Sequence, residues 1–258
     1  MSTRTQDYRI CVVGLGYVGL PVAHAFAAKF DGVIGYDISR ARVDELTRGQ
    51  DSTGELTGEQ LAQVDLVFTN DASAIAKCNF IVVAVPTPIN IDRNPDFTIL
   101  QSACRTVGAN LSAGSTIVFE STVHPGATED ICGPILEEAS GLTAGVDFKL
   151  AYSPERINPG DKVHTIDQIV KVVSGQDAET LDLVATAYEA IIDAGVHRAS
   201  SIKVAEAAKV LENTQRDINI AFINEVSMIF SHAGLSTHDV LAAAATHYAA
   251  VLLVVRFA

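Results

Sequence analysis

Residues 9–21 read RICVVGLGYVGLP, and this segment is the most informative about the fold. A short apolar run at positions 10–13 is followed by three spaced glycines and then by helix-forming residues. The spacing is the G-x-G-x-x-G pattern that occurs where the first strand of a dinucleotide-binding α/β unit turns into its helix. Gly14 would form the tight turn, Gly16 would let a pyrophosphate approach, and Gly19 would let helix and strand pack closely. The residues that we expect to contact a cofactor here are Gly14, Gly16, Tyr17, Val18 and Gly19.

An acidic residue ends the second apolar segment. Residues 32–36, GVIGY, lead into Asp37, at the distance of about 20 residues expected for a carboxylate that accepts the ribose hydroxyls. An aspartate here favours NAD over NADP, because it would repel a 2′-phosphate. A structural glycine-rich turn with a solvated aspartate is the alternative interpretation.

Composition excludes several classes of function. The net charge of −13 leaves no basic stripe for a nucleic acid. The four cysteines show no C-x-x-C spacing, so we expect reduced, buried thiols and no metal site. Residues 1–8 lack the apolar core of a signal peptide, and the apolar stretch 240–258 is interrupted and too short to span a bilayer. We therefore expect a cytoplasmic protein with no membrane partner.

Strand-like and helix-like segments alternate along the first 200 residues, which predicts a doubly wound parallel (Rossmann-type) α/β sheet. The segment Phe80–Val85 is apolar throughout, as expected for a parallel strand covered on both faces. Ligands bind such sheets beyond the carboxyl ends of the strands. The predicted strands lie near 10–13, 32–36, 66–69, 80–85, 116–119, 148–152 and 169–174, and the predicted helices near 22–29, 39–49, 98–111 and 127–138.

The pattern changes after residue 200. Residues 203–230 contain no Gly or Pro and carry apolar residues at helical spacing, with Ser200 or Ser201 as a cap and Gly234 beyond the end. A helix of this length usually bridges domains or supports a dimer interface, so we expect a homodimer through it. Ser236 is the predicted cap of a following helix.

Three further segments go beyond a generic dinucleotide fold: ESTVHPG at 120–126, YSPERINPGD at 152–161 and AEAAKVLENT at 205–214. Together with GLGYVGL at 14–20 and VPTP at 85–88, they resemble the UDP-glucose/GDP-mannose dehydrogenase family of nucleotide-sugar 6-dehydrogenases. The resemblance runs from about Arg9 to about Ala245. It implies an NAD-binding domain at 1–199, a connecting or dimerisation helix and the start of a truncated all-helical second domain at 200–245, and an atypical tail at 246–258.

The segment SPERINPGD resembles the branch that acts on UDP-N-acetylhexosamines. The resemblance implies oxidation of C6 of UDP-N-acetylglucosamine or its galactosamine epimer to the uronic acid, with two NAD reduced per turnover. It assigns Thr122, Glu155, Lys209 and Asn213 to catalysis, with Lys209 and Asn213 donating to the substrate oxygen and Glu155 hydrolysing a thioester. It also implies cofactor contacts for Arg42, Thr87 and Thr122, and substrate contacts for Glu155, Arg156, Ile157, Asn158, Lys209 and Asn213.

On spacing alone, a solvated helix lysine is the favoured interpretation of Lys209, and Thr87 and Thr122 are ordinary hydroxyls at strand ends. The family's nucleophilic cysteine lies in a GGHCIG-type segment, which this sequence lacks. We therefore expect NAD binding with impaired turnover. Two other functions stay open: a non-catalytic NAD-binding or dimerisation module, and a β-hydroxyacid-type dehydrogenase with a helix lysine as base. The YSPER segment disfavours the latter, since a hydroxyacid enzyme has no thioester to hydrolyse.

Overall fold

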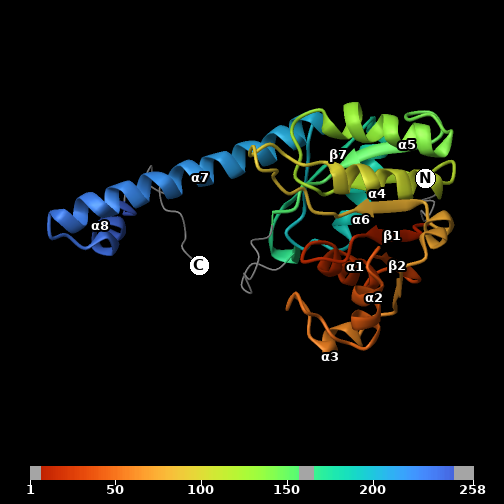
Figure 1. The fold of residues 1–258 in the computed structure, drawn as a ribbon, viewed down its shortest axis with the longest axis horizontal. Helices are drawn as coiled ribbons and strands as arrows, with labels where there is room; N and C mark the ends of the chain where they lie inside the picture. The colour runs from red at the N-terminus through yellow and green to blue at the C-terminus, as the bar shows by residue number, and fades with distance from the viewer. Residues whose placement is uncertain (1–6, 157–165, 247–258) are drawn as a thin grey trace. The chain divides into compact units, whose positions relative to one another are not determined.

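The computed structural model describes residues 7–156 and 166–246, and the chain divides into two compact units (Figure 1). The first unit runs through Ala207 and the second begins at Ala208. The predicted domain boundary at 199/200 stays a prediction.

The first unit is built on one eight-stranded sheet with the order β3-β2-β1-β4-β5-β6-β7-β8. Every neighbouring pair is parallel except β6 and β7. The predicted α/β doubly wound fold is therefore confirmed. The strands are β1 (Ile10–Val13), β2 (Val33–Tyr36), β3 (Leu66–Thr69), β4 (Phe80–Val83), β5 (Thr116–Phe119), β6 (Lys149–Tyr152), β7 (Lys171–Gly175) and β8 (Val196–Arg198).

Two features of the sheet differ from the sequence prediction. Strand β8 was not predicted, since it has three residues and two of them are exposed. Strand β7 runs antiparallel to β6, with Tyr152 paired to Ser174. Apolar periodicity locates a strand but carries no information on its direction. The prediction of a parallel sheet therefore does not hold for the β6–β7 pair.

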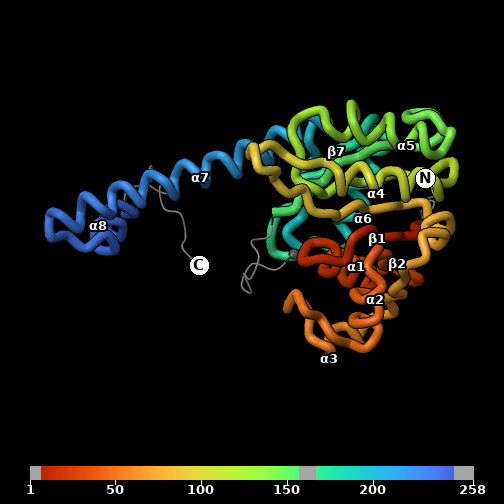
Figure 2. Tube along the Cα trace, in the orientation of Figure 1, coloured from red at the N-terminus to blue at the C-terminus, as the bar shows by residue number. Residues whose placement is uncertain are grey.

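Helices cover both faces of the sheet, as Figure 1 shows. Alternate residues of β1 and β4 point into two separate cores: Cys11 and Ile81 pack with α4 and α5, whereas Val12 and Val82 pack with α1 and α6. The trace in Figure 2 shows α4 and α5 lying side by side. All positions of β1, β4 and β5 are buried, as expected for strands covered on both faces. The helices that cover the two faces are α1 (Gly19–Ala27), α4 (Thr98–Ala109), α5 (Gly133–Ser140) and α6 (Ala178–Glu189).

Shorter elements complete the unit: α2 (Arg40–Thr47), α3 (Gly58–Leu61), 3-10 turns at Ala72–Lys77 and Ile166–Gln168, and a π-helical turn at Thr128–Cys132. Side chains cap several helix starts. Ser39 accepts a hydrogen bond from the backbone N–H of Arg42 at the start of α2, and Asp177 accepts one from Thr180 at the start of α6. Each cap satisfies a backbone N–H that has no partner within its helix.

The predicted long helix is α7, Ile202–His232, and Ser201 caps it by accepting from the backbone N–H of Val204 at 3.2 Å. α7 ends at His232, Gly234 has a φ of +71° in the turn after it, and α8 (Thr237–Ala244) follows in the second unit. Ser236 accepts from the backbone N–H of Asp239, which confirms the predicted cap. Within the described ranges, no helix has the length and apolar character needed to cross a membrane.

Candidate functional site

The glycine-rich loop after β1 has the geometry that its sequence predicts. Gly14 has a φ of +92° and donates its backbone N–H to the carbonyl of Tyr36 at 2.8 Å, which ties the loop to β2. A Cβ on Gly19 would lie 1.8 Å from the Gly14 carbonyl oxygen, so only glycine lets α1 start so close to the loop. A Cβ on Gly16 would meet nothing within 4 Å. The space over Gly16 is therefore open, as an incoming pyrophosphate requires.

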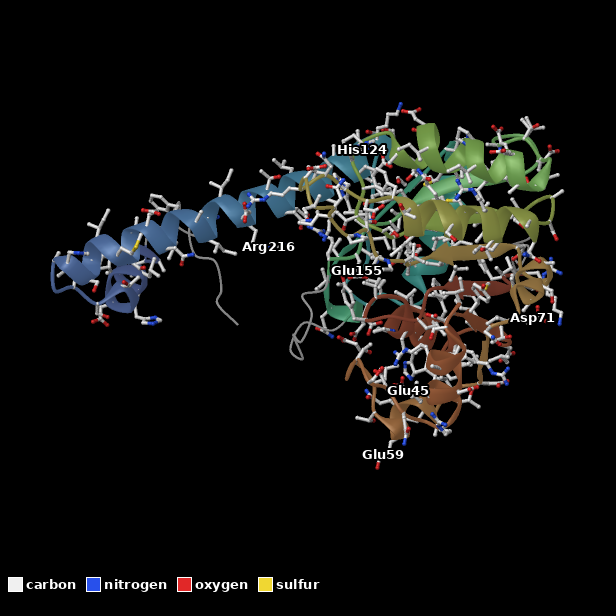
Figure 3. All side chains as sticks on the ribbon, viewed as in Figure 1. Glu45, Glu59, Asp71, His124, Glu155 and Arg216 are labelled. Carbon is white, nitrogen blue, oxygen red and sulfur yellow. The ribbon has the colours of Figure 1, made fainter. Side chains whose placement is uncertain are left out.

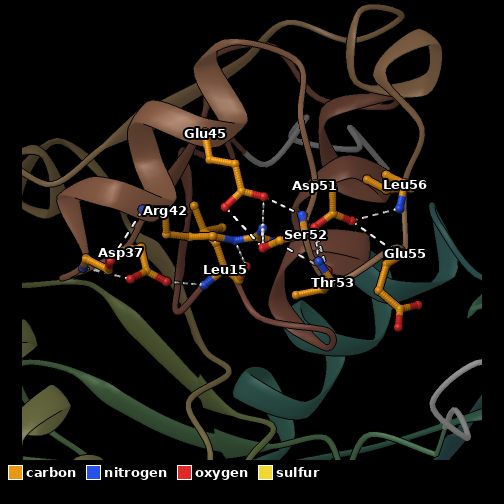
Figure 4. A network of polar contacts seen from close by, with 10 residues as sticks. Leu15, Asp37, Arg42, Glu45, Asp51, Ser52, Thr53, Glu55 and Leu56 are labelled. Atoms are coloured by element: carbon orange, nitrogen blue, oxygen red, sulfur yellow. Dashed lines mark hydrogen bonds and ion pairs between the residues drawn. The ribbon is translucent and has the colours of Figure 1, made fainter.

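Asp37 lies directly after β2 and faces this loop. Its Oδ2 accepts a hydrogen bond from the backbone N–H of Leu15 and its Oδ1 accepts one from Ser39, both at 2.8 Å (Figure 4). A carboxylate has about four acceptor positions, so these two bonds leave room for the hydroxyls of a ribose. The half-buried Asp37 is held beside the glycine loop in a position that suits the predicted role.

Arg42, a predicted cofactor contact, is hydrogen-bonded to the backbone of the same loop (Figure 4). Its Nε donates to the Leu15 carbonyl at 2.9 Å, while its two terminal nitrogens pair with Glu45 at 3.0 Å and Asp51 at 2.7 Å. The Asp51 side chain is fully buried, and it also accepts from the backbone N–H groups of residues 53, 55 and 56. The hydroxyls of Ser52 and Thr53 also accept from the guanidinium, each at 3.4 Å, and its contact with a cofactor stays a prediction.

Thr87 lies just beyond β4, the strand next to β1. Its Oγ1 is buried and has no hydrogen-bond partner among the residues that the structure describes. A buried hydroxyl without a partner is costly, and a bound ligand would remove that cost. Tyr17 is 50% exposed and Val18 is half-buried beside the glycines. The open space at Gly16, the Asp37 carboxylate and the Thr87 hydroxyl together fit a dinucleotide.

The predicted catalytic residues of the first unit follow two adjacent parallel strands. Thr122 comes shortly after β5 and is exposed, and Glu155 comes shortly after β6 and is buried (Figure 3 labels Glu155). The sheet therefore brings both segments to its carboxyl edge, where ligands of such folds bind. Beside Thr122, the hydroxyl of Ser121 donates to the Val85 carbonyl at 2.6 Å, which ties this segment to the one that carries Thr87.

A buried ionic cluster that was not predicted from the sequence adjoins Glu155. The Nζ of Lys171 lies 3.0 Å from Glu155 Oε2 and 3.1 Å from Glu120 Oε2, and the hydroxyl of Tyr188 donates to Glu120 Oε1. Burial raises the pKa of Glu120 against the opposing effect of Lys171. Burial acts to lower the pKa of Lys171, but the two carboxylates outweigh it and the net direction is upward. The one feature of the sequence that could have indicated this cluster is Lys171, a charged residue inside an apolar strand segment.

Glu206 anchors the turn that follows Thr122. Its buried carboxylate accepts the backbone N–H of Gly126 at 2.5 Å and that of Thr128 at 2.9 Å. These amides lie at the start of the π-helical turn that leads into α5, so a negative charge there also suits the positive end of the helix dipole. Glu206 lies within the AEAAK segment, in which only Lys209 was assigned a role from the sequence.

The remaining predicted site residues are placed as follows. Arg156 donates its backbone N–H to Glu155 Oε1 at 2.6 Å and its Nη1 to the Val170 carbonyl at 3.2 Å. Ile157 and Asn158 lie outside the described residues. In the second unit, Lys209 is buried and Asn213 is half-buried one helical turn later, where it accepts from Arg216 at 2.7 Å.

The thiols of the chain are buried in the first unit. All four cysteines are buried at 3% exposure or less: Cys11, Cys78, Cys104 and Cys132. Over residues 7–156 and 166–246, no group of three or more His, Cys, Asp or Glu side chains is arranged to hold a metal ion.

Comparisons with known proteins identify relatives along most of the chain. Protein CapL of Staphylococcus aureus is 53% identical over 243 residues, which cover 94% of this chain and 57% of CapL. A UDP-N-acetyl-D-glucosamine 6-dehydrogenase of Pseudomonas aeruginosa is 51% identical, with 94% of this chain and 58% of the enzyme covered. The chain thus spans somewhat more than half the length of these relatives.

Comparison with solved structures also identifies nucleotide-sugar dehydrogenases. The UDP-D-ManNAc dehydrogenase of Pyrococcus horikoshii superposes with a TM-score of 0.84 at 32% identity, covering 93% of this chain and 58% of that one. Residues 8–192 match the NAD binding domain of the UDP-glucose/GDP-mannose dehydrogenase family, and residues 203–253 match its central domain. The second match reaches past Ala245, where the sequence resemblance was placed as ending. The assignment of the glycine loop and Asp37 to NAD stays a prediction. The first unit is therefore an NAD-binding domain, and the chain belongs to the UDP-glucose/GDP-mannose dehydrogenase family.

Proposed function

We propose that this chain takes part in the NAD-dependent oxidation of C6 of a UDP-N-acetylhexosamine. The observation that carries the proposal is the arrangement at the carboxyl edge of the sheet, where Asp37 is bonded to the glycine loop and Thr122 and Glu155 follow neighbouring strands. The substrate class is supported by relatives in Pseudomonas aeruginosa and Salmonella typhi, 51% and 48% identical, both named UDP-N-acetyl-D-glucosamine 6-dehydrogenase.

Each proposed residue has a task that suits its chemistry. Bound NAD would accept a hydride from C6, which converts the alcohol to an aldehyde and releases a proton. Lys209 and Asn213 would donate hydrogen bonds to the substrate oxygen as charge develops on it. Glu155 would activate a water at a later, hydrolytic step. Thr122 would lie near the nicotinamide, and Arg156, Ile157 and Asn158 would contact the sugar nucleotide.

The cysteines limit which step this chain performs. Conversion of the aldehyde to the acid through a thiohemiacetal needs an accessible thiol, and all four thiols are buried in the first unit. We therefore assign the first hydride transfer to this chain and no covalent step to its cysteines. The expected product is the aldehyde, formed slowly, with at most one NADH for each sugar nucleotide.

Absorbance at 340 nm tests this proposal with the full chain, NAD and UDP-N-acetylglucosamine. NADH formation that requires the sugar nucleotide, and is slower with UDP-glucose, would support the activity and the substrate class. Bound NAD with no NADH from either sugar nucleotide would overturn the assignment of hydride transfer. Two NADH per sugar would contradict the restriction to the first step.

A second candidate function, a non-catalytic dimerisation module, is favoured by one observation on the long helix. Apolar side chains along α7 and just beyond it are between 38% and 70% exposed: Val210, Leu211, Ile218, Phe222, Met228, Ile229 and Leu235. We propose that a second copy of the chain covers them, since an exposed apolar surface of this kind marks an association site. Light scattering on wild type and Phe222→Asp tests it: a dimer that the substitution converts to monomer supports the interface, and a monomeric wild type refutes it.

The β-hydroxyacid alternative receives less support. A 3-hydroxyisobutyrate dehydrogenase of Mycobacterium tuberculosis superposes with a TM-score of 0.69, but its 14% identity shows a shared fold and nothing finer.

A further inference from the structure

The cluster around Lys171 contains three ionic side chains that are almost completely buried. The side chains of Lys171 and Glu120 are 4% and 0% exposed, and that of Glu155 is 10% exposed. The ammonium group also lies 5.6 Å from the centre of the Tyr188 ring. Two carboxylates thus share one lysine in the interior of the first unit. A buried ion pair seldom improves stability over an apolar replacement, because desolvation offsets the attraction.

The reversal of strand direction at β7 explains how Lys171 reaches Glu155. Tyr152, the last residue of β6, pairs with Ser174, and β7 begins three residues earlier in the chain. Continuing this antiparallel register beyond β6 by three residues places Glu155 opposite Lys171. In a parallel arrangement, the first residue of β7 would instead lie at the other end of β6. The antiparallel pair therefore positions a cation at the carboxyl edge of the sheet.

Glu120 and Tyr188 contact Lys171 in the interior of the first unit. Glu120 follows β5 directly, and its second oxygen accepts from the hydroxyl of Tyr188 on α6. On the open side, Glu155 Oε1 accepts the backbone N–H of Arg156 at 2.6 Å. Glu120 after β5 and Tyr188 on α6 therefore surround Lys171, and Lys171 on β7 in turn contacts Glu155, the most exposed of the three ionic side chains.

We propose that Lys171 is a positioning residue that holds the Glu155 carboxylate ionised and in one orientation, with Glu120 and Tyr188 as its anchors. The inference rests on the proposed function, in which Glu155 activates a water. A base must be unprotonated at the working pH, and a bound ammonium group favours that form. Glu120 has the opposite effect on Glu155, since a nearby like charge favours protonation.

The two neighbours of Glu155 should therefore shift its titration in opposite directions. Lys171→Met removes the cation and should move the protonation midpoint of Glu155 to higher pH. Glu120→Gln removes a negative charge of similar size and should move the midpoint to lower pH. Lys171→Arg keeps the charge and should restore a midpoint close to that of the wild type. General loosening of the fold would not produce shifts of opposite sign.

The experiment is a pH titration of glutamate carboxyl carbons by ¹³C NMR on the full chain labelled at glutamate. The Glu155 signal is assigned by its loss in Glu155→Gln. Lys149→Met is the matched control, because it removes a lysine from a half-exposed ion pair with Asp177 and should leave the Glu155 midpoint unchanged. If Lys171→Met does not fold, Glu120→Gln and Lys171→Arg still decide the question.

Shifts of the same sign in Lys171→Met and Glu120→Gln would overturn the proposal, as would an unchanged midpoint in Glu120→Gln. The titration needs no substrate, so it is independent of the proposed activity. Shifted midpoints in a chain that forms no sugar-dependent NADH would remove the proposed function and leave the positioning by Lys171 standing. Unshifted midpoints in a chain that does form NADH would do the reverse.

Discussion

The carboxylate of Asp37 accepts the backbone N–H of Leu15 at 2.8 Å, so the end of β2 and the glycine loop after β1 are bonded to each other. The residue proposed to hold the ribose therefore also shapes the loop proposed to hold the pyrophosphate. Both parts of the proposed NAD site therefore depend on this one side chain.

Replacing Asp37 with alanine should weaken NAD binding by about tenfold to a hundredfold. The ribose loses hydrogen bonds to a charged acceptor, each worth about 1.5–3 kcal/mol. Calorimetric titration with NAD measures the change. Asp31→Ala is the matched control, because Asp31 is an exposed residue in the turn before β2. Equal affinities for the wild type and Asp37→Ala would refute the ribose assignment.

Two glycines of the same loop should respond differently to alanine. In Gly19→Ala the new Cβ meets the Gly14 carbonyl oxygen, so the loop must shift and we expect a loss of about 1–3 kcal/mol or more in unfolding free energy. Gly16→Ala adds a methyl group to open space, so stability should change by less than about 0.5 kcal/mol while NAD affinity falls. Urea unfolding and calorimetry separate the two effects. A Gly16→Ala protein that binds NAD normally would show that the pyrophosphate lies elsewhere.

Asp177 should give the first unit a pH-dependent contribution to stability. The Lys149 ammonium, at 2.8 Å, and hydrogen bonds from Thr180 lower the pKa of Asp177 from 3.8 to about 2. Because the folded pKa is the lower one, this contribution is complete above about pH 5 and is lost as the pH falls through 3.8 toward 2.

Asp177→Ala should therefore cost about 1 kcal/mol at pH 7, the usual value of a helix cap, and less at pH 3. Urea unfolding at both pH values gives the comparison, and Asp193→Ala, an exposed residue after α6, serves as the control. A cost that is the same at both pH values would contradict the role of the ionised carboxylate.

Lys209→Met should slow sugar-dependent NADH formation by about 10²–10³-fold and leave NAD affinity unchanged, because the lysine is proposed to stabilise charge on the substrate oxygen. Lys203→Met is a control on the same helix, since Lys203 is 53% exposed and pairs with Asp130. Rate at 340 nm and calorimetry are measured on the same samples. Similar rates for Lys209→Met and Lys203→Met would remove Lys209 from the catalytic set.

The sequence was informative where a local pattern fixes a local geometry. The glycine spacing, the acidic residue after the second strand and the cap at Ser236 each depend on a few neighbouring residues, and the structure places them as predicted. The apolar runs also located seven of the strands. These features are set within one turn or one strand, where chain spacing determines what meets.

The cluster around Lys171 could not be predicted in the same way. Glu120 and Lys171 are 51 positions apart, and their contact depends on strand order and on the reversed direction of β7. The sequence predicts Lys171 in an apolar strand and Glu120 at the start of the ESTVHPG segment, and nothing in either segment indicates that the two residues meet. Register between strands distant in the chain is a property of the folded sheet, so periodicity alone does not reveal it.

The most direct test of the central claim is a calorimetric titration of the full chain with NAD and, separately, with NADP. We predict one NAD site per chain and an affinity for NADP at least about tenfold lower, which corresponds to about 1.4 kcal/mol, because the Asp37 carboxylate would face the 2′-phosphate. Absence of NAD binding, or binding of NADP as tight as that of NAD, would contradict the assignment of the glycine loop and Asp37 to this cofactor.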